Sequence, residues 1–253
     1  MFGTKSRGRT PLTQARVVLA QREVAYQIRR SRRRTVGLSI DSERGLVVHC
    51  PGRLSVSRLE SILRDKSGWI LKKIAETEQR KASRTSRSWQ EGMLLPLQGN
   101  WYPLRLASHK GPPRICLEAG ELRLYAEGNG TLLPPENDEL KELVYAGYRP
   151  LAATLIEQRV FMLAGETGLQ PARVRIREQK RRWGSCSAKK WLNLNWRLAL
   201  APPEVMDYVI LHELCHLEHL NHSPRFWSRV GYFMPDYGRH RRWLRENGSE
   251  LFL

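Results

Sequence analysis

Four of the seven histidines lie within eleven residues, and two of them, His212 and His216, frame the segment His-Glu-Leu-Cys-His. On an α-helix, residues four apart share one face, so this spacing brings both imidazoles to a single metal ion. Glu213 follows the first histidine, where its carboxylate can take a proton from a metal-bound water. Because bound zinc lowers the pKa of water from about 15.7 towards 7, the segment predicts metal-dependent hydrolysis near neutral pH.

A catalytic zinc usually has a third protein ligand, and the residues after the motif offer one. His219 shares the helix face of His212, but seven residues of continuous helix would separate the two by about 10.5 Å along its axis. Asn221 is a residue type that ends helices, and a Ser-Pro pair typical of a new helix start follows it. The chain is therefore predicted to turn back at His222, which makes His222 the third ligand, with Glu218 and His219 as alternatives.

Basic, aromatic and amide side chains flank this cluster on both sides. The run 177–183 combines dense positive charge with a tryptophan, a combination that suits phosphate and base contacts. Tyrosines and a histidine beyond the cluster can stabilise a developing oxyanion. The residues predicted to bind a substrate or a phosphate are Arg181, Arg182, Asn195, Tyr237 and His240. For each of them, a purely structural role is the alternative.

These residues need a helix and a strand to position them. Residues 191–198 alternate between the two faces of an extended chain, which predicts a strand shortly before the metal helix. We expect an extended peptide to pair with this strand over 192–196, unless the strand lies inside a sheet. A long helix is predicted over 138–163, with a kink or break at Pro150. From residue 202 onward the pattern is helical.

The first half of the chain is rich in strand patterns. Period-two alternation and turn residues predict strands at 24–28, 36–40, 46–50, 102–106, 114–117 and 121–125. The second and third of these are expected to form a hairpin. A helix capped by Ser55 or Ser57 is predicted to reach Ile74, and the polar run 80–88 is the best linker candidate.

The whole pattern predicts an α+β fold. Its expected parts are a flexible basic arm at 1–20, a β-rich region with one helix at 21–132, and a metal-binding catalytic domain at 133–253. The chain has 253 residues, with 43 Lys and Arg against 25 Asp and Glu, a formal net charge of +18. This excess of positive charge indicates an acidic or phosphate-bearing partner, nucleic acid included.

Composition also narrows the location. No run of 18 apolar residues is present to form a transmembrane helix, and the apolar stretch near the N-terminus is too short for a signal peptide. The four cysteines form no Cys-x-x-Cys pair, so neither a cysteine zinc finger nor a disulfide framework is expected. Together these features predict a reducing, cytoplasmic environment.

The stretch from His212 to Leu244 resembles the signature of the YgjP-like metal-dependent hydrolases, a zincin-type metallopeptidase family related to the SprT-like proteases. The block Arg182–Ser187, followed by residues 192–198, is also similar to the pattern of that family. The resemblance implies a zincin-like helical core with a small sheet. It also implies one Zn²⁺ held by the three histidines at 212, 216 and 222, with Glu213 as the base.

These observations together predict an intracellular zinc metallopeptidase that acts on a peptide or protein. A metal-dependent nucleotide hydrolase is the first alternative, in which basic residues clamp the phosphates and a phosphoanhydride bond is cleaved at the same site. The second alternative is a nucleic-acid-binding module whose metal is structural, or a protease recruited to nucleic acid.

Overall fold

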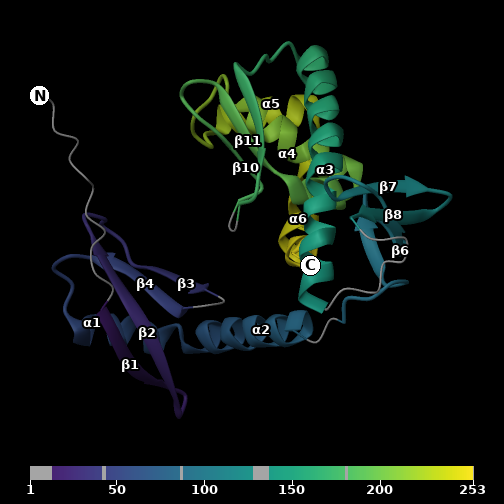
Figure 1. The fold of residues 1–253 in the computed structure, drawn as a ribbon. Coiled ribbons are helices and arrows are strands. Elements are labelled where there is room, and N and C mark those ends of the chain that lie inside the picture. The colour runs from purple at the N-terminus through teal and green to yellow at the C-terminus, as the bar shows by residue number, and fades with distance from the viewer. Residues whose placement is uncertain (1–12, 42–43, 86–87, 128–136, 180–181, 253) are drawn as a thin grey trace, which may run out of the picture. The chain divides into compact units, whose positions relative to one another are not determined.

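The computed structural model describes residues 13–41, 44–85, 88–127, 137–179 and 182–252 (Figure 1). The chain divides into two compact units, Met1–Arg87 and Ser88–Leu253. The α+β class predicted from the sequence is confirmed, because helices and several small sheets occur together. No helix in the described part of the chain is both long enough and apolar enough to cross a membrane.

The first unit is a four-stranded sheet with two helices on one face. Its strands are β1 (Thr13–Leu19), β2 (Arg22–Ser31), β3 (Gly37–Asp41) and β4 (Gly45–Pro51), in the order β1-β2-β4-β3. β2 runs parallel to β4, whereas β1–β2 and β3–β4 are antiparallel pairs. Helices α1 (Val56–Asp65) and α2 (Ser67–Thr85) pack Leu59, Leu63 and Ile70 against alternate residues of the strands. Neither helix covers the opposite face of the sheet.

The predicted strands and hairpin of this unit are confirmed, and Ser55 caps α1 by accepting a hydrogen bond from the backbone N–H of Arg58 at 3.3 Å. The expected flexible arm is wrong for residues 13–19, which form β1. The reason is that Val17 and Leu19 are buried in the core while the strand pairs with β2 along its length. Residues 1–12 lie outside the described part. The predicted linker is helical as far as Thr85.

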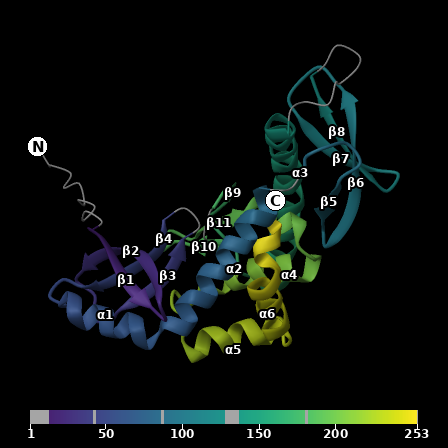
Figure 2. The same ribbon diagram turned by 90° about the horizontal axis from the view of Figure 1, so that it is seen from below.

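The second unit contains two sheets and a long helix. One sheet has the order β5-β6-β8-β7, and its strands are β5 (Leu94–Leu97), β6 (Asn100–Ser108), β7 (Arg114–Glu118) and β8 (Glu121–Ala126). The other has the order β10-β11-β9, with β9 (Arg173–Arg177), β10 (Gly184–Cys186) and β11 (Trp191–Asn195). Helix α3 (Asn137–Thr167) runs beside both sheets and contacts β7, β8 and β9 (Figure 2).

Helix α3 continues through Pro150, so the predicted break is wrong. The turn before the proline packs tightly against the sheet formed by β5 to β8. This packing holds the helix together although Pro150 has no N–H to donate a helical hydrogen bond. Gly147 lies so close to β7 and β8 that an added Cβ would sit 2.9 Å from Ile115 and 3.1 Å from Leu124. Because α3 packs on β7 and β8, these strands belong to the same compact unit as the helix. The boundary between the two units therefore lies at Arg87, whereas the sequence prediction placed a domain boundary near residue 132.

The remaining elements are short helices around a buried one. They are the 3-10 turn η1 (Trp196–Leu200), α4 (Pro203–Cys215), α5 (Pro224–Phe233), α6 (Tyr237–Asn247) and the 3-10 turn η2 (Gly248–Leu251). Almost every residue of α4 from Val205 onward is buried, which marks it as the central helix of this unit. Asp207 of α4 binds the guanidinium of Arg159 on α3 through both oxygens, at 2.5 and 2.7 Å. This pair fixes α4 against α3.

Candidate metal centre

The last turn of α4 carries two of the predicted site residues. His212 and Glu213 lie in that turn, and His216 is the C-cap residue. The helix therefore ends before Asn221, the residue predicted to end it, and Asn221 is not among the described residues with positive φ. The chain leaves the helix through a tight turn in which the N–H groups of Glu218 and His219 both donate to the carbonyl of Cys215.

The start of α5 places His222. Ser223 is the N-cap of α5, its hydroxyl accepts a hydrogen bond from the N–H of Phe226 at 3.4 Å, and Pro224 occupies the first helical position. Phe226 is fully buried beneath the histidines. Its ring centroid lies 4.8, 4.4 and 4.9 Å from the rings of His212, His216 and His222. One aromatic ring thus supports all three imidazoles.

The three imidazoles converge on one point. Their ligand nitrogens all lie within 4.8 Å of one another, and Nε2 of His212 is 3.0 Å from Nε2 of His222. Nδ1 of His216 is 2.8 Å from the carbonyl oxygen of His219, which leaves its Nε2 free to bind an ion. Three imidazole nitrogens at this spacing fit the donor set of a catalytic zinc, which takes nitrogen ligands about 2.0–2.1 Å from the ion.

The alternatives for the third ligand have other partners. Both carboxylate oxygens of Glu218 accept hydrogen bonds from Arg229, at 2.8 and 3.1 Å. His219 contributes its backbone carbonyl to His216 and is not part of the cluster of ligand nitrogens. Burial, the two other histidines and Arg241 lower the pKa of His212 to about 3, which keeps its imidazole neutral. A neutral imidazole is the form that binds a metal.

Glu213 lies beside the cluster in a buried position. Its side chain packs on the backbone of Gly184, and it accepts a hydrogen bond from the backbone N–H of Cys186. Oε2 is buried and has no hydrogen-bond partner among the described residues. Burial raises the pKa of this carboxyl to about 7, against the opposing effects of Arg182 and the Cys186 hydrogen bond. The free oxygen and the raised pKa suit a group that exchanges a proton near neutrality.

A cavity of about 400 Å³ opens in front of His212 and Glu213. Its wall comes from β10 and the loop before it, α4 and α6, and includes Arg182, Trp183, Gly184, Tyr208, Val209, Arg241, Leu244 and Arg245. The sequence prediction found Arg182 but missed Tyr208, Arg241 and Arg245 as wall residues. Helical spacing could have indicated them. Tyr208 is one turn before His212 on α4, and Arg241 and Arg245 share one face of α6.

The other residues predicted to bind a substrate are placed differently. Arg181 lies outside the described residues. Asn195 is fully buried, and its amide nitrogen donates to the carbonyls of Gln179 and Arg182 at 2.8 and 3.1 Å. Its side chain therefore holds the loop that carries Arg182. Tyr237 stacks on Trp227 at 5.3 Å behind the histidines, and His240 is bound to Asp236 at 3.0 Å. Neither belongs to the cavity wall.

The strand prediction needs two corrections. Residues 196–198 belong to η1, because the side chain of Asn195 caps that turn by accepting from the N–H of Arg197 at 3.2 Å. β11 lies between β10 and β9, so a peptide cannot pair with its edge. The edge strand beside Glu213 is β10. Because the backbones of Trp183 and Ser187 are hydrogen-bonded to β11, those of Gly184 and Cys186 face the free edge.

Gly184 is the neighbour that holds Glu213 most closely. A Cβ at this position would lie 2.6 Å from both Cγ and Oε1 of Glu213, well inside van der Waals contact. We therefore expect Gly184→Ala to displace the carboxylate and to lower kcat by about 100-fold, because small misplacements of a catalytic group have effects of that size. KM and metal content are expected to stay near their wild-type values, as steady-state kinetics and metal analysis would measure.

The matched control is Gly165→Ala in α3, where no atom lies within 4 Å of an added Cβ. This variant should keep full activity and gain about 0.5–1 kcal/mol of stability from the better helix propensity of alanine. A Gly184→Ala enzyme with wild-type kcat would show that Glu213 is not positioned by this contact.

The YgjP-like family, described as a metallopeptidase domain, matches residues 34–247. Among solved structures, the metallopeptidase zymogen abylysin of Pyrococcus abyssi is 26% identical over 36% of this chain and 93% of its own, with a TM-score of 0.33. The comparison with curated proteins returned no match.

Proposed function

The chain belongs to the YgjP-like metallopeptidase family, and from that premise we propose that it is a zinc-dependent peptidase. In this proposal His212, His216 and His222 hold one Zn²⁺, and Glu213 is the general base. The observation that carries the proposal is the convergence of three imidazole nitrogens beside a buried carboxylate, one of whose oxygens has no hydrogen-bond partner among the described residues. A cytoplasmic location is part of the proposal and is supported by four free cysteines.

The protein residues divide the work of hydrolysis between them. When bound, zinc polarises a carbonyl and makes a nucleophile available near neutral pH. Oε2 of Glu213 accepts the proton of the attacking water and returns it to the leaving amine. The backbone N–H of Cys186 donates to the carboxylate and helps to fix it, and Oε2, which has no partner among the described residues, is the oxygen that exchanges the proton. Phe226 keeps the imidazoles in place by packing beneath them.

The free edge of β10 suits an extended peptide. Gly184 and Cys186 direct their backbone groups to this edge, and the N–H of Cys186 is already taken by Glu213. We propose that the substrate pairs with the backbone of Gly184, which brings its main chain alongside the catalytic carboxylate. Arg182, Arg241 and Arg245 on the cavity wall favour a substrate with acidic side chains near the cleaved bond.

The same three arginines support the second candidate, a metal-dependent hydrolase of a nucleotide phosphoanhydride. Guanidinium groups bind phosphate oxygens through paired hydrogen bonds, and three of them surround one cavity here. The metal and Glu213 would keep their roles, and only the bond that is cleaved would differ. Family membership favours the peptide bond.

One experiment separates the two candidates. The zinc-loaded protein is incubated in parallel with casein, with a library of acidic peptides, and with a panel of nucleoside triphosphates. Peptidase activity predicts new peptide termini that disappear when a chelator removes the metal, and no release of phosphate from nucleotides. Phosphate or pyrophosphate release, with casein and the peptides intact, would instead establish the nucleotide hydrolase.

A further inference from the structure

The positive charge of the chain is concentrated in the unit that lacks the metal cluster. Residues 1–87 contain 21 Lys and Arg against seven Asp and Glu, whereas residues 88–253 contain 22 against 18. The first unit therefore carries +14 of the total charge of +18, although it is about a third of the chain. The arginines around the catalytic cavity do not account for this excess.

The densest part of this charge is the segment Arg29–Arg34, which has five arginines in six residues. It forms the end of β2 and the start of the connection to β3. Because β4 lies between these two strands, the connection passes the end of β4 and spreads the arginines across one end of the sheet. Blocks of like charge of this length are typical of nucleic-acid-binding surfaces.

Two of the five arginines have structural roles and three do not. Arg30 donates to the carbonyls of Pro51, Gly52 and Leu54 at 3.4, 2.9 and 2.7 Å, which fixes the chain after β4. The guanidinium of Arg33 lies over Gly37, where an added Cβ would be 2.9 Å away. Three others, Arg29, Arg32 and Arg34, are exposed, and none forms an ion pair within the described residues.

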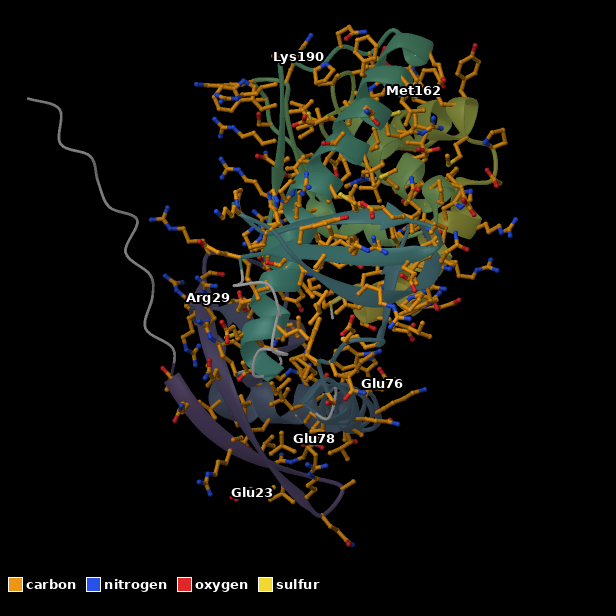
Figure 3. The ribbon with its side chains drawn as sticks, turned by 45° about the vertical axis from the view of Figure 1, so that its right-hand side comes forward. Glu23, Arg29, Glu76, Glu78, Met162 and Lys190 are labelled. Carbon is orange, nitrogen blue, oxygen red and sulfur yellow. The ribbon has the colours of Figure 1, made fainter. Side chains whose placement is uncertain are left out.

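Four acidic side chains among the described residues of this unit form ion pairs with basic residues outside the segment Arg29–Arg34. Glu23 binds Arg16 and Glu78 binds Arg22, and these pairs lie around the start of β2. Glu23 and Arg29 are six residues apart on the same strand, so about 20 Å separates them. In Figure 3, Glu23 and Glu78 lie towards one end of the sheet and Arg29 towards the other. Within the described residues, none of these carboxylates forms an ion pair with Arg29, Arg32 or Arg34.

The arginine end continues onto the face of the sheet opposite to α1 and α2. Arg29 is opposite His49 on β4, and His49 is opposite Gly37 on β3, so these residues and the Arg33 guanidinium form one row across the strands. Arg29 and Arg33 both act on His49, whose pKa is lowered by burial and by these two charges. The row is polar, and no Phe, Tyr or Trp side chain of the described residues projects from this face.

We propose that this arginine end, made of Arg29, Arg32, Arg33 and Arg34 with the adjoining row, binds the phosphate backbone of a nucleic-acid duplex. A duplex presents closely spaced phosphates on a rigid surface, and guanidinium groups neutralise them without reading base sequence. Single strands are bound mainly by stacking on aromatic side chains, and no Phe, Tyr or Trp of the described residues projects from this face. The site is independent of the peptidase proposal and lies in the other unit, so it is a second function of the chain.

Fluorescence anisotropy with the full-length protein tests the proposal. The probes are labelled 20-base-pair DNA and RNA duplexes and the matching single strands, titrated between 50 and 200 mM salt. With three to four phosphate contacts, log K should fall with log[salt] at a slope of about −3, and base sequence should make little difference. Arg29→Glu with Arg32→Glu should weaken duplex binding at least about 10-fold and reduce the slope by about 2.

The matched control is Arg58→Glu with Lys72→Glu, which makes the same change in net charge on exposed positions of α1 and α2. This control and Glu213→Gln should bind duplexes with nearly wild-type affinity, and the Arg29/Arg32 variant should keep wild-type peptidase kinetics. Equal weakening by both pairs of substitutions would overturn the assignment of the site. Tighter binding of single strands, or binding of phosphatidylserine vesicles but not of duplexes, would overturn the duplex as the ligand.

Discussion

Replacing Glu213 with glutamine is expected to lower the rate of peptide hydrolysis by about 10²–10⁴-fold, the usual contribution of a general acid-base group. Glutamine has the shape of glutamate, and its carbonyl oxygen can still accept the hydrogen bond from the N–H of Cys186. It cannot take a proton from water at the position of Oε2, the oxygen without a partner. Binding should survive while the chemical step is lost, so kcat falls and KM changes little.

Two measurements and one control variant make this result specific. Metal analysis should find the same zinc content in Glu213→Gln and in the wild type, because the three histidines are untouched. Thermal unfolding should show no loss of stability, since a neutral side chain replaces a buried acid of the same size. Glu218→Gln is the matched control, because it removes only a partly exposed ion pair with Arg229, worth about 0–1 kcal/mol. Full activity of Glu213→Gln would place the base elsewhere.

The parts of the site that depend on local spacing could be predicted from the sequence. The i, i+4 relation of His212 and His216 holds on any α-helix, and Ser223-Pro224 is a start signal that acts within one turn. Together these two local signals predict that His222 lies beside His212, although they do not predict the residue at which α4 ends. A helix end depends on which turn the next few residues can form. Here the carbonyl of Cys215 accepts two N–H groups and ends the helix early.

The parts that depend on partners far away in the sequence could not be predicted. Whether β11 is an edge or a central strand is decided by its pairing with β9 and β10, and β10 has only three residues and no periodic pattern. Asn195 has a polar side chain that suits a substrate contact, yet its amide nitrogen donates to the carbonyls of Gln179 and Arg182. The role of Gly184 could not be predicted from the sequence either, because this glycine acts by leaving space for the side chain of Glu213, which is distant in the sequence.

The place of the charged surface could not be predicted from the composition of the whole chain either. The composition indicates an acidic or phosphate-bearing partner but does not place it. Arginines near the metal motif are conspicuous in the sequence, and three of them do line the catalytic cavity. Most of the excess nevertheless belongs to the other unit, whose net charge is +14. Most of the excess positive charge thus lies in one unit and the histidine cluster in the other. The partner that binds the charged surface and the substrate of the histidine site can therefore be different molecules.

Replacing His222 with alanine is expected to remove the metal and with it the activity. The substitution leaves two imidazoles, and a loss of zinc affinity of more than about 100-fold is expected, since changes to groups that only support a ligand already cost 10–100-fold. Measured as zinc per chain after gel filtration, the content should fall from about one to near zero. At a zinc concentration of 100 times the wild-type Kd, zinc-dependent stabilisation should fall from about 2.7 kcal/mol towards 0.4 kcal/mol or less.

His219→Ala is the control that isolates the role of the side chain. His219 lies three residues before His222 and is also a histidine, but only its backbone carbonyl contacts the site, through Nδ1 of His216. Alanine keeps that carbonyl, so the control should keep its zinc and its activity. Without metal, the His222→Ala chain should unfold at the wild-type temperature, because Ser223, Pro224 and the buried Phe226 still hold α5. Zinc bound tightly by His222→Ala and lost by His219→Ala would exchange the roles of the two histidines and make His219 the third ligand.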